Sequence, residues 1–186
     1  PRINLISISG HKIYGPKGIG ALIARKHDRQ LPPLRPLMFG GGQEQGLRPG
    51  TLPVPLIAGL GEAAKLAARN NGERVDKCRS FREQAFSVFS ALGVVQNGAE
   101  EYTLPHVLNI SLPGINSDQA IKALKNVIAV SSTSACTSHA HTPSYVLAAM
   151  GLSPDKVEQS IRLSWCHMTP DVDWSEVKNI LRALHG

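Results

Sequence analysis

A stretch rich in proline and glycine, residues 28–55, limits what this chain can fold into. It reads DRQLPPLRPLMFGGGQEQGLRPGTLPVP and contains six of the chain's 13 prolines and three successive glycines. Proline lacks the backbone N–H that helices and central strands need, so this composition sustains neither element. A long irregular loop inside a compact protein is uncommon and usually functional. The stretch therefore predicts a functional loop between two ordered parts of the chain.

The part before the loop has the pattern of strands. Apolar runs at residues 3–9 and 19–24 flank a glycine- and proline-containing turn at 15–18. This arrangement predicts a hairpin, or two adjoining strands, with His11 and Lys12 between them.

The part after the loop begins with a helical pattern at residues 56–92, which predicts two helices or one long kinked helix linking two lobes. Strand and helix patterns then alternate, as expected for an α/β or α+β lobe with helices covering a sheet. The predicted strands are 94–95, 107–112, 128–131 and 161–165, and the predicted helices are 118–125, 144–150, one starting at 153–155, and 173–184.

The composition is that of an ordinary globular protein. Hydrophobic residues make up 42% and charged residues 18% of the chain, which excludes collagen-like, coiled-coil and wholly disordered classes. The 20 lysines and arginines exceed the 14 aspartates and glutamates, giving a net charge of +6, but aromatic residues are only 5%. Because single-stranded nucleic-acid binders stack bases on aromatic rings, a basic nucleic-acid module is a minor alternative, and no direct nucleic-acid binding is expected.

The sequence predicts a cytoplasmic protein. Its apolar runs are far shorter than the roughly 20 residues of a membrane helix, and its first residues lack the apolar core of a signal peptide. The three cysteines, Cys78, Cys136 and Cys166, are an odd number without CxxC spacing. This usage argues against a disulfide framework and indicates free thiols in a reducing compartment.

Lys12 is the first candidate for chemistry. It follows a predicted strand within SGHKIYGPKG, where a lysine can be buried enough to act as a nucleophilic amine toward a carbonyl. Ser9 and His11 are able to donate hydrogen bonds to a phosphate near that amine. The alternative interpretation is a solvated surface lysine beside a basic turn.

Cys136 is the second candidate. It lies in SSTSACTSHAH, where small hydroxylated residues predict a mobile loop that exposes a reactive thiol. One alternative is an inert small residue in a turn. Another is a zinc site formed by Cys136, His139 and His141, but that set lacks a fourth ligand, so no metal is predicted.

Two further segments are candidates for binding. In SIRLS, Ile161 and Leu163 face a core, so Arg162 points to the other face of its strand and suits bidentate recognition of a carboxylate. The alternative is a surface arginine on an edge strand. The glycines of residues 40–51 allow a backbone to approach a ligand or a second chain, or form a flexible connector.

Together these motifs resemble one family. SGHKIYGPKGIGAL, GGGQEQGLRPGT, SSTSACTS followed by PSYVLAAMG, and SIRLS occur in the order found in cysteine desulfurases of the NifS/IscS type. These are enzymes of the class V aminotransferase family that use pyridoxal 5'-phosphate. The resemblance extends from Ile3 nearly to the C-terminus. It implies the aspartate aminotransferase-like fold, type I of the pyridoxal-phosphate enzymes.

The resemblance also implies roles for individual residues. Lys12 is similar to the lysine that bonds the cofactor, with Ser9 and His11 on its phosphate. Thr51 resembles the threonine that reaches the cofactor phosphate of the neighbouring subunit, which implies a homodimer. Arg162 resembles the arginine that binds the substrate carboxylate. Finally, Cys136 resembles the catalytic cysteine that takes the substrate sulfur as a persulfide.

The implied reaction converts L-cysteine to L-alanine and passes the sulfur to an acceptor protein, such as an iron–sulfur scaffold or a thiolation enzyme, or to DNA phosphorothioation. The implied domains are the end of the cofactor-binding large domain (1–55), connecting helices (56–92) and the small C-terminal domain with the cysteine loop (93–186). Because the family supplies further cofactor contacts before its lysine, we expect the 186 residues alone to have little activity. The alternatives are a selenocysteine lyase, an aminotransferase, and a non-catalytic sulfur-carrier domain.

Overall fold

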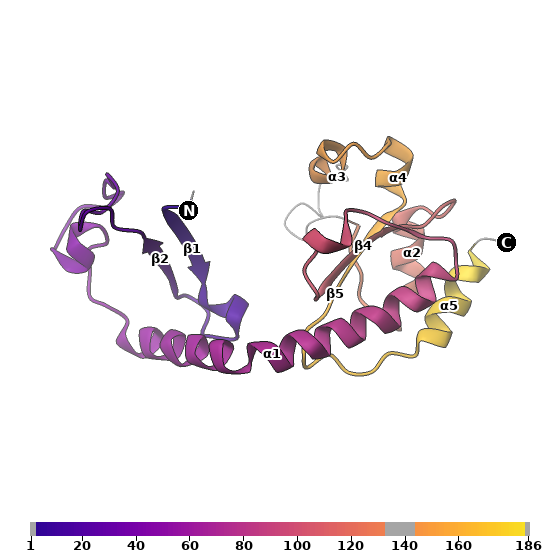
Figure 1. The fold of residues 1–186 in the computed structure, drawn as a ribbon, viewed down its shortest axis with the longest axis horizontal. Coiled ribbons are helices and arrows are strands. Elements are labelled where there is room, and N and C mark those ends of the chain that lie inside the picture. Colours follow the sequence, from indigo (N-terminus) through magenta and orange to yellow (C-terminus); the bar gives the residue numbers. More distant parts are fainter. Residues whose placement is uncertain (1–2, 133–143, 185–186) are drawn as a thin grey trace. The chain divides into compact units, whose positions relative to one another are not determined.

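The computed structural model describes residues 3–132 and 144–184 (Figure 1). The chain divides into two compact units, Pro1–Asn71 and Gly72–Gly186. Cys136 and the rest of its loop, residues 133–143, lie outside the described residues. Within the described part, no helix is both long enough and apolar enough to cross a membrane.

The first unit contains the predicted hairpin. Strands β1 (Leu5–Ser9) and β2 (Gly20–Ala24) pair antiparallel, and Ser9 stands opposite Gly20 at the end of the pairing. A 3-10 turn, η1 (Gly10–Ile13), follows β1 directly. His11 and Lys12 therefore lie on a tight turn at the end of a strand, as the sequence predicts.

The proline- and glycine-rich stretch is irregular, as its composition predicts. Between β2 and residue 53 the chain forms only a short 3-10 turn, η2 (Gln43–Gly46), and one isolated bridge between His27 and Gln30. The positive φ of Gly46 (77°) and Gly50 (100°) is a conformation that side chains with a Cβ rarely adopt. These glycines therefore shape the loop.

A single 37-residue helix, α1 (Val54–Ser90), follows the loop. The pattern predicts two helices or one long kinked helix, and the structure has a single helix over this stretch. Pro53 and Pro55 lie at its start, where a missing backbone N–H costs least. The boundary between the two units falls within α1, after Asn71.

The second unit is built on an antiparallel sheet of β3 (Val95–Gln96), β4 (Val107–Ser111) and β5 (Ser160–Ser164), in that spatial order. The last helix, α5 (Trp174–Ala183), is capped by Asp173, whose carboxylate accepts hydrogen bonds from the backbone N–H groups of Ser175 and Glu176. The elements are β3 (Val95–Gln96), η3 (Glu100–Tyr102), β4 (Val107–Ser111), α2 (Ser117–Leu124), α3 (Tyr145–Ala149), α4 (Pro154–Glu158), β5 (Ser160–Ser164) and α5 (Trp174–Ala183).

The strand predicted at residues 128–131 is wrong. The backbone N–H groups of Val127 and Ile128 both donate to the carbonyl of Leu124, so the chain leaves α2 through a turn. Only Ser131 reaches the sheet, where it forms an isolated bridge with Arg162. The local apolar pattern cannot reveal this turn, because it depends on where α2 ends.

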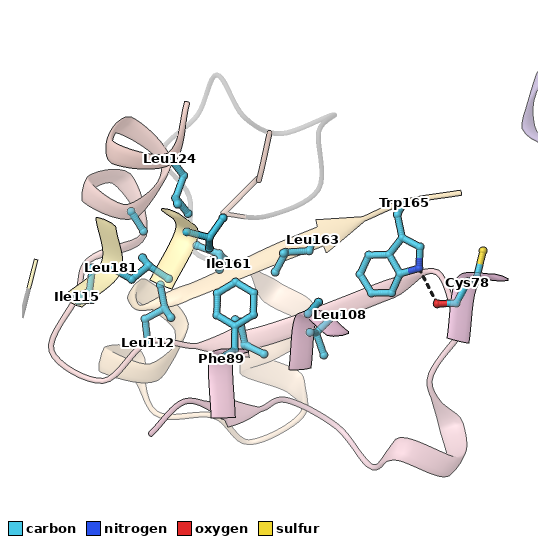
Figure 2. Close-up of a cluster of buried hydrophobic side chains, with 14 residues drawn as sticks. Cys78, Phe89, Leu108, Leu112, Ile115, Leu124, Ile161, Leu163, Trp165 and Leu181 are labelled. Carbon is cyan, nitrogen blue, oxygen red and sulfur yellow. Dashed lines mark hydrogen bonds between the residues drawn. The ribbon is translucent and has the colours of Figure 1, made fainter. Parts of the chain in front are cut away.

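The core of the second unit lies against one face of the sheet. Leu108 and Ile110 of β4 and Ile161 and Leu163 of β5 are buried together with Phe89 of α1 (Figure 2). Trp165 donates a 3.0 Å hydrogen bond from its indole Nε1 to the carbonyl of Cys78, which ties the end of β5 to α1. Alternate residues of each strand therefore build the core, as a period of two requires.

Replacing Phe89 with alanine tests this core. The ring is fully buried, so we expect Phe89→Ala to lower the free energy of unfolding by about 3–5 kcal/mol, since the lost contacts leave a cavity. Phe86→Ala is the matched control on the same helix, because that ring is 36% exposed and its loss costs only about 1 kcal/mol. Urea unfolding followed by fluorescence of Trp165 and Trp174 measures the free energy of unfolding of both variants. Equal decreases for Phe89→Ala and Phe86→Ala would contradict the assignment of Phe89 to the core.

Candidate functional site

The turn that carries Lys12 is closed by the backbone of Gly10. Its N–H donates to the carbonyl of Ile19 (2.8 Å), and its own carbonyl accepts from the N–H of Gly15 (2.9 Å). A Cβ added at Gly10 would lie 3.0 Å from both the Cγ2 and the carbonyl oxygen of Ile19. A side chain here would therefore require Ile19 to shift, and backbone hydrogen bonds fix the turn to the chain just before β2.

The first turns of α1 hold this turn from outside. A Cβ at Gly59 would lie 2.6 Å from the Cγ of Pro16, so the helix backbone packs directly on the proline. The buried Ala63 lies beside Gly15, whose added Cβ would be 3.2 Å from the Ala63 Cβ. Small residues at these positions allow α1 to pack closely against the Lys12 turn.

The side chains on the turn are accessible. Lys12 and His11 are exposed and Ser9 is half-buried. Within the described residues, Lys12 makes no ion pair with a carboxylate. The turn thus presents a primary amine, an imidazole and a hydroxyl within four residues. An amine can condense with a carbonyl group, and the other two groups can bind an anion beside it.

Thr51 lies at the end of the glycine-rich loop in the same unit, and it is exposed. Arg48 donates from Nη1 to the carbonyls of Gly50 (3.2 Å) and Thr51 (3.4 Å). Gln43 accepts from the N–H of Gly50 through its Oε1 (3.1 Å). Arg48 and Gln43 therefore shape the loop around Thr51, a role that their charge and polarity alone do not indicate.

Arg162 lies in β5 of the second unit, on the face opposite the core, as the alternation of SIRLS predicts. Its backbone N–H donates to the carbonyl of Ser131 (2.6 Å), and its carbonyl accepts from the N–H of Ser131 (3.1 Å). Its guanidinium Nε is buried and has no hydrogen-bond partner within the described part of the chain. A buried donor without a partner is costly, so this nitrogen indicates a place for an anion.

The sheet face around Arg162 carries a polar cluster that we define as Asn97, Asn109, Ser111 and Ser160. Asn97 donates from Nδ2 to Asn109 Oδ1 (2.8 Å) and lies 3.0 Å from the hydroxyls of Ser111 and Ser160. Both serine hydroxyls donate to the carbonyl of Lys156. The motifs do not predict this cluster, although the alternating polar positions 109 and 111 of VLNIS are a signal for it.

The structure thus groups Ser9, His11 and Lys12 on one turn, with Thr51 on another segment of the same unit. Arg162 belongs to the second unit, and Cys136 lies outside the described residues. Among residues 3–132 and 144–184 no three histidine, cysteine, aspartate or glutamate side chains are arranged to hold a metal ion.

The two described cysteines differ in access. Cys78 is buried, and this burial, with the nearby Cys166 thiol as a second cause, raises the pKa of its thiol. Cys166 is half-buried, and its sulfur accepts a hydrogen bond from the backbone N–H of Met168 (3.4 Å). Since the thiolate is the reactive form, Cys78 is a poor nucleophile.

Comparison with known proteins decides the family. The model of the aminotransferase class-V family matches residues 2–177. The chain belongs to this family. The match confirms the class V aminotransferase membership and the fold class that the four motifs predict.

Among relatives of this class-V chain, the cysteine desulfurase IscS of Pectobacterium carotovorum is 43% identical over 186 residues. That alignment covers all of this chain and 45% of the relative, so the chain spans about half the length of the curated relatives it matches. A solved NifS-like protein is 32% identical with a TM-score of 0.78, over 98% of this chain and 46% of the other. DndA from Streptomyces lividans is 39% identical with a TM-score of 0.72, over 88% and 47%.

The difference between the thiols can be tested by alkylation. We expect iodoacetamide at neutral pH to label Cys166 well before Cys78, because Cys78 is buried and its raised pKa keeps it protonated. Raising the pH should bring labelling of Cys78 only above the range in which an ordinary thiol ionises. Peptide mass spectrometry over time gives both rates, and the unfolded chain in urea is the control. Equal alkylation rates for the two thiols of the native chain would contradict the predicted difference in reactivity.

Proposed function

We propose that this chain is part of a cysteine desulfurase, which converts L-cysteine to L-alanine and keeps the sulfur as a persulfide. The observation that carries the proposal is 41–43% identity over all 186 residues to proteins named cysteine desulfurase IscS. Solved relatives include NifS-like proteins and DndA. The roles of the individual residues below are part of the same proposal.

The Lys12 turn suits pyridoxal 5'-phosphate. Lys12 is an exposed amine without an ion pair within the described residues, so it can bond an aldehyde cofactor. Ser9 and His11 supply donors for its phosphate, and Thr51 supplies one for the phosphate of the neighbouring subunit in a homodimer. When bound, the cofactor supplies an electron sink for the carbon skeleton of the amino acid.

Arg162 holds the substrate. Its guanidinium pairs with the carboxylate of L-cysteine, which gives an acceptor to the buried Nε that has none among the described residues. A rigid strand, fixed by Asn109 on one side and by the backbone of Ser131 on the other, gives the pair a constant position.

Lys12 and Cys136 carry out the chemistry. The free amine of Lys12 takes the α-proton of the substrate and later returns a proton. The thiolate of Cys136 attacks the substrate sulfur: a sulfur–sulfur bond forms and the carbon–sulfur bond breaks. The electron pair of the broken bond stays on the carbon skeleton, which is protonated to alanine. Cys136 is left as a persulfide for an acceptor protein.

The proposal assigns a task to each stretch of the chain. Residues 1–55 contribute the cofactor and dimer contacts, residues 56–92 connect them to the rest, and residues 93–186 contribute the carboxylate site and the sulfur-bearing loop. Among alternatives within the family, the names of the most similar relatives favour cysteine over selenocysteine as the substrate.

The central role of Lys12 is tested in the full-length protein. We expect Lys12→Ala to lower alanine and sulfide production from L-cysteine by more than a thousandfold, since proton transfer and cofactor bonding are both lost. Lys17→Ala is the matched control, because Lys17 is an exposed lysine on the next turn, and it should retain activity. A Lys12→Ala variant with near-normal turnover would overturn the proposal.

A further inference from the structure

Asn109 lies directly opposite Arg162 in the antiparallel pairing of β4 and β5. Leu108 and Ile110, its neighbours along the strand, are buried in the core, so Asn109 and Arg162 occupy the opposite, polar face. Directly opposed residues have Cβ atoms about 4.5–5.5 Å apart, so these two side chains stand next to each other.

The orientation of the Asn109 amide is set by its neighbours. Its Oδ1 accepts the 2.8 Å hydrogen bond from Asn97 Nδ2. Asn97 is only 8% exposed. Ser111 and Ser160, whose hydroxyls lie beside its amide, are 2% and 0% exposed. With its oxygen engaged by this buried polar cluster, Asn109 has its Nδ2 group left as a donor.

Two donors on this face have no partner among the described residues. Within the described residues, Asn109 Nδ2 donates no hydrogen bond, and Arg162 Nε is buried without an acceptor. Both belong to adjacent side chains on neighbouring strands. A carboxylate offers two oxygens with several lone pairs, so it can accept from an arginine and an amide at once.

We propose that Asn109 is a second carboxylate-binding residue, which acts with Arg162 to select amino acids that keep their carboxylate. This inference rests on the proposed function, since it concerns the same substrate site. The buried polar cluster positions Asn109 before substrate arrives, so little ordering is needed on binding. Arg162 supplies the charge, and Asn109 fixes which way the carboxylate faces.

The first test is kinetic and uses the full-length protein with L-cysteine. Asn109→Ala should raise KM about tenfold with kcat within about twofold, because one hydrogen bond to a charged group is lost. Asn109→Asp keeps an oxygen that accepts from Asn97, and the added negative charge should raise KM further. Asn179→Ala, which removes an exposed asparagine of α5, is the matched control and should leave KM unchanged.

The second test measures binding without turnover and so separates this inference from the proposed function. In the 186-residue chain, the Arg162 Nε–H NMR signal should shift on titration with L-alanine but not with ethylamine, which lacks the carboxylate. The shift should need about tenfold more L-alanine in Asn109→Ala. No shift in the unmodified chain, or an unchanged titration in Asn109→Ala together with an unchanged KM in full-length Asn109→Ala and Asn109→Asp, would overturn the role of Asn109. A shift in the 186-residue chain with no desulfurase activity in the full-length protein would overturn only the proposed function.

Discussion

The antiparallel pairing of β4 with β5 is the constraint on which the second unit depends. Because side chains alternate along paired strands, burying Ile161 and Leu163 in the core commits Arg162 to the other face. A slip by one residue would place the guanidinium in the core and two apolar side chains in solvent. The hydrophobic effect that folds the sheet therefore also places the proposed carboxylate site.

The polar face of that sheet has a buried part, formed by Asn97, Ser111 and Ser160. Asn97, Ser111 and Ser160 satisfy one another and the carbonyl of Lys156, so burial does not leave them without partners. Loss of any member of such a network leaves a buried polar group without a partner and destabilises the fold. When complete, the network favours a single local arrangement of these side chains. Within residues 3–132 and 144–184, the buried Nε of Arg162 has no such partner, which is why we propose that it binds the carboxylate of a ligand.

Much of the fold could be predicted from the sequence where one local rule decides the outcome. The prolines and glycines of residues 28–55 predicted the loop, and the alternation of SIRLS placed Arg162 on the correct face. The prediction of a strand at 128–131 was wrong because the chain turns at the end of α2.

The polar cluster could not be recognised from the sequence, since Asn97 and Ser160 are 63 positions apart and only the fold brings them together. The roles of Lys12, Thr51 and Cys136 came from resemblance, because a lysine on a turn or a cysteine in a serine-rich loop is ambiguous on physical grounds alone.

The central claim is that sulfur from L-cysteine is transferred to Cys136. The most direct measurement incubates the full-length protein with L-cysteine, alkylates it and locates added sulfur by peptide mass spectrometry. The account predicts one additional sulfur atom on the peptide that contains Cys136, and none on that peptide in Lys12→Ala. Added sulfur confined to Cys78 or Cys166, or sulfur on Cys136 only when another desulfurase is supplied, would contradict it.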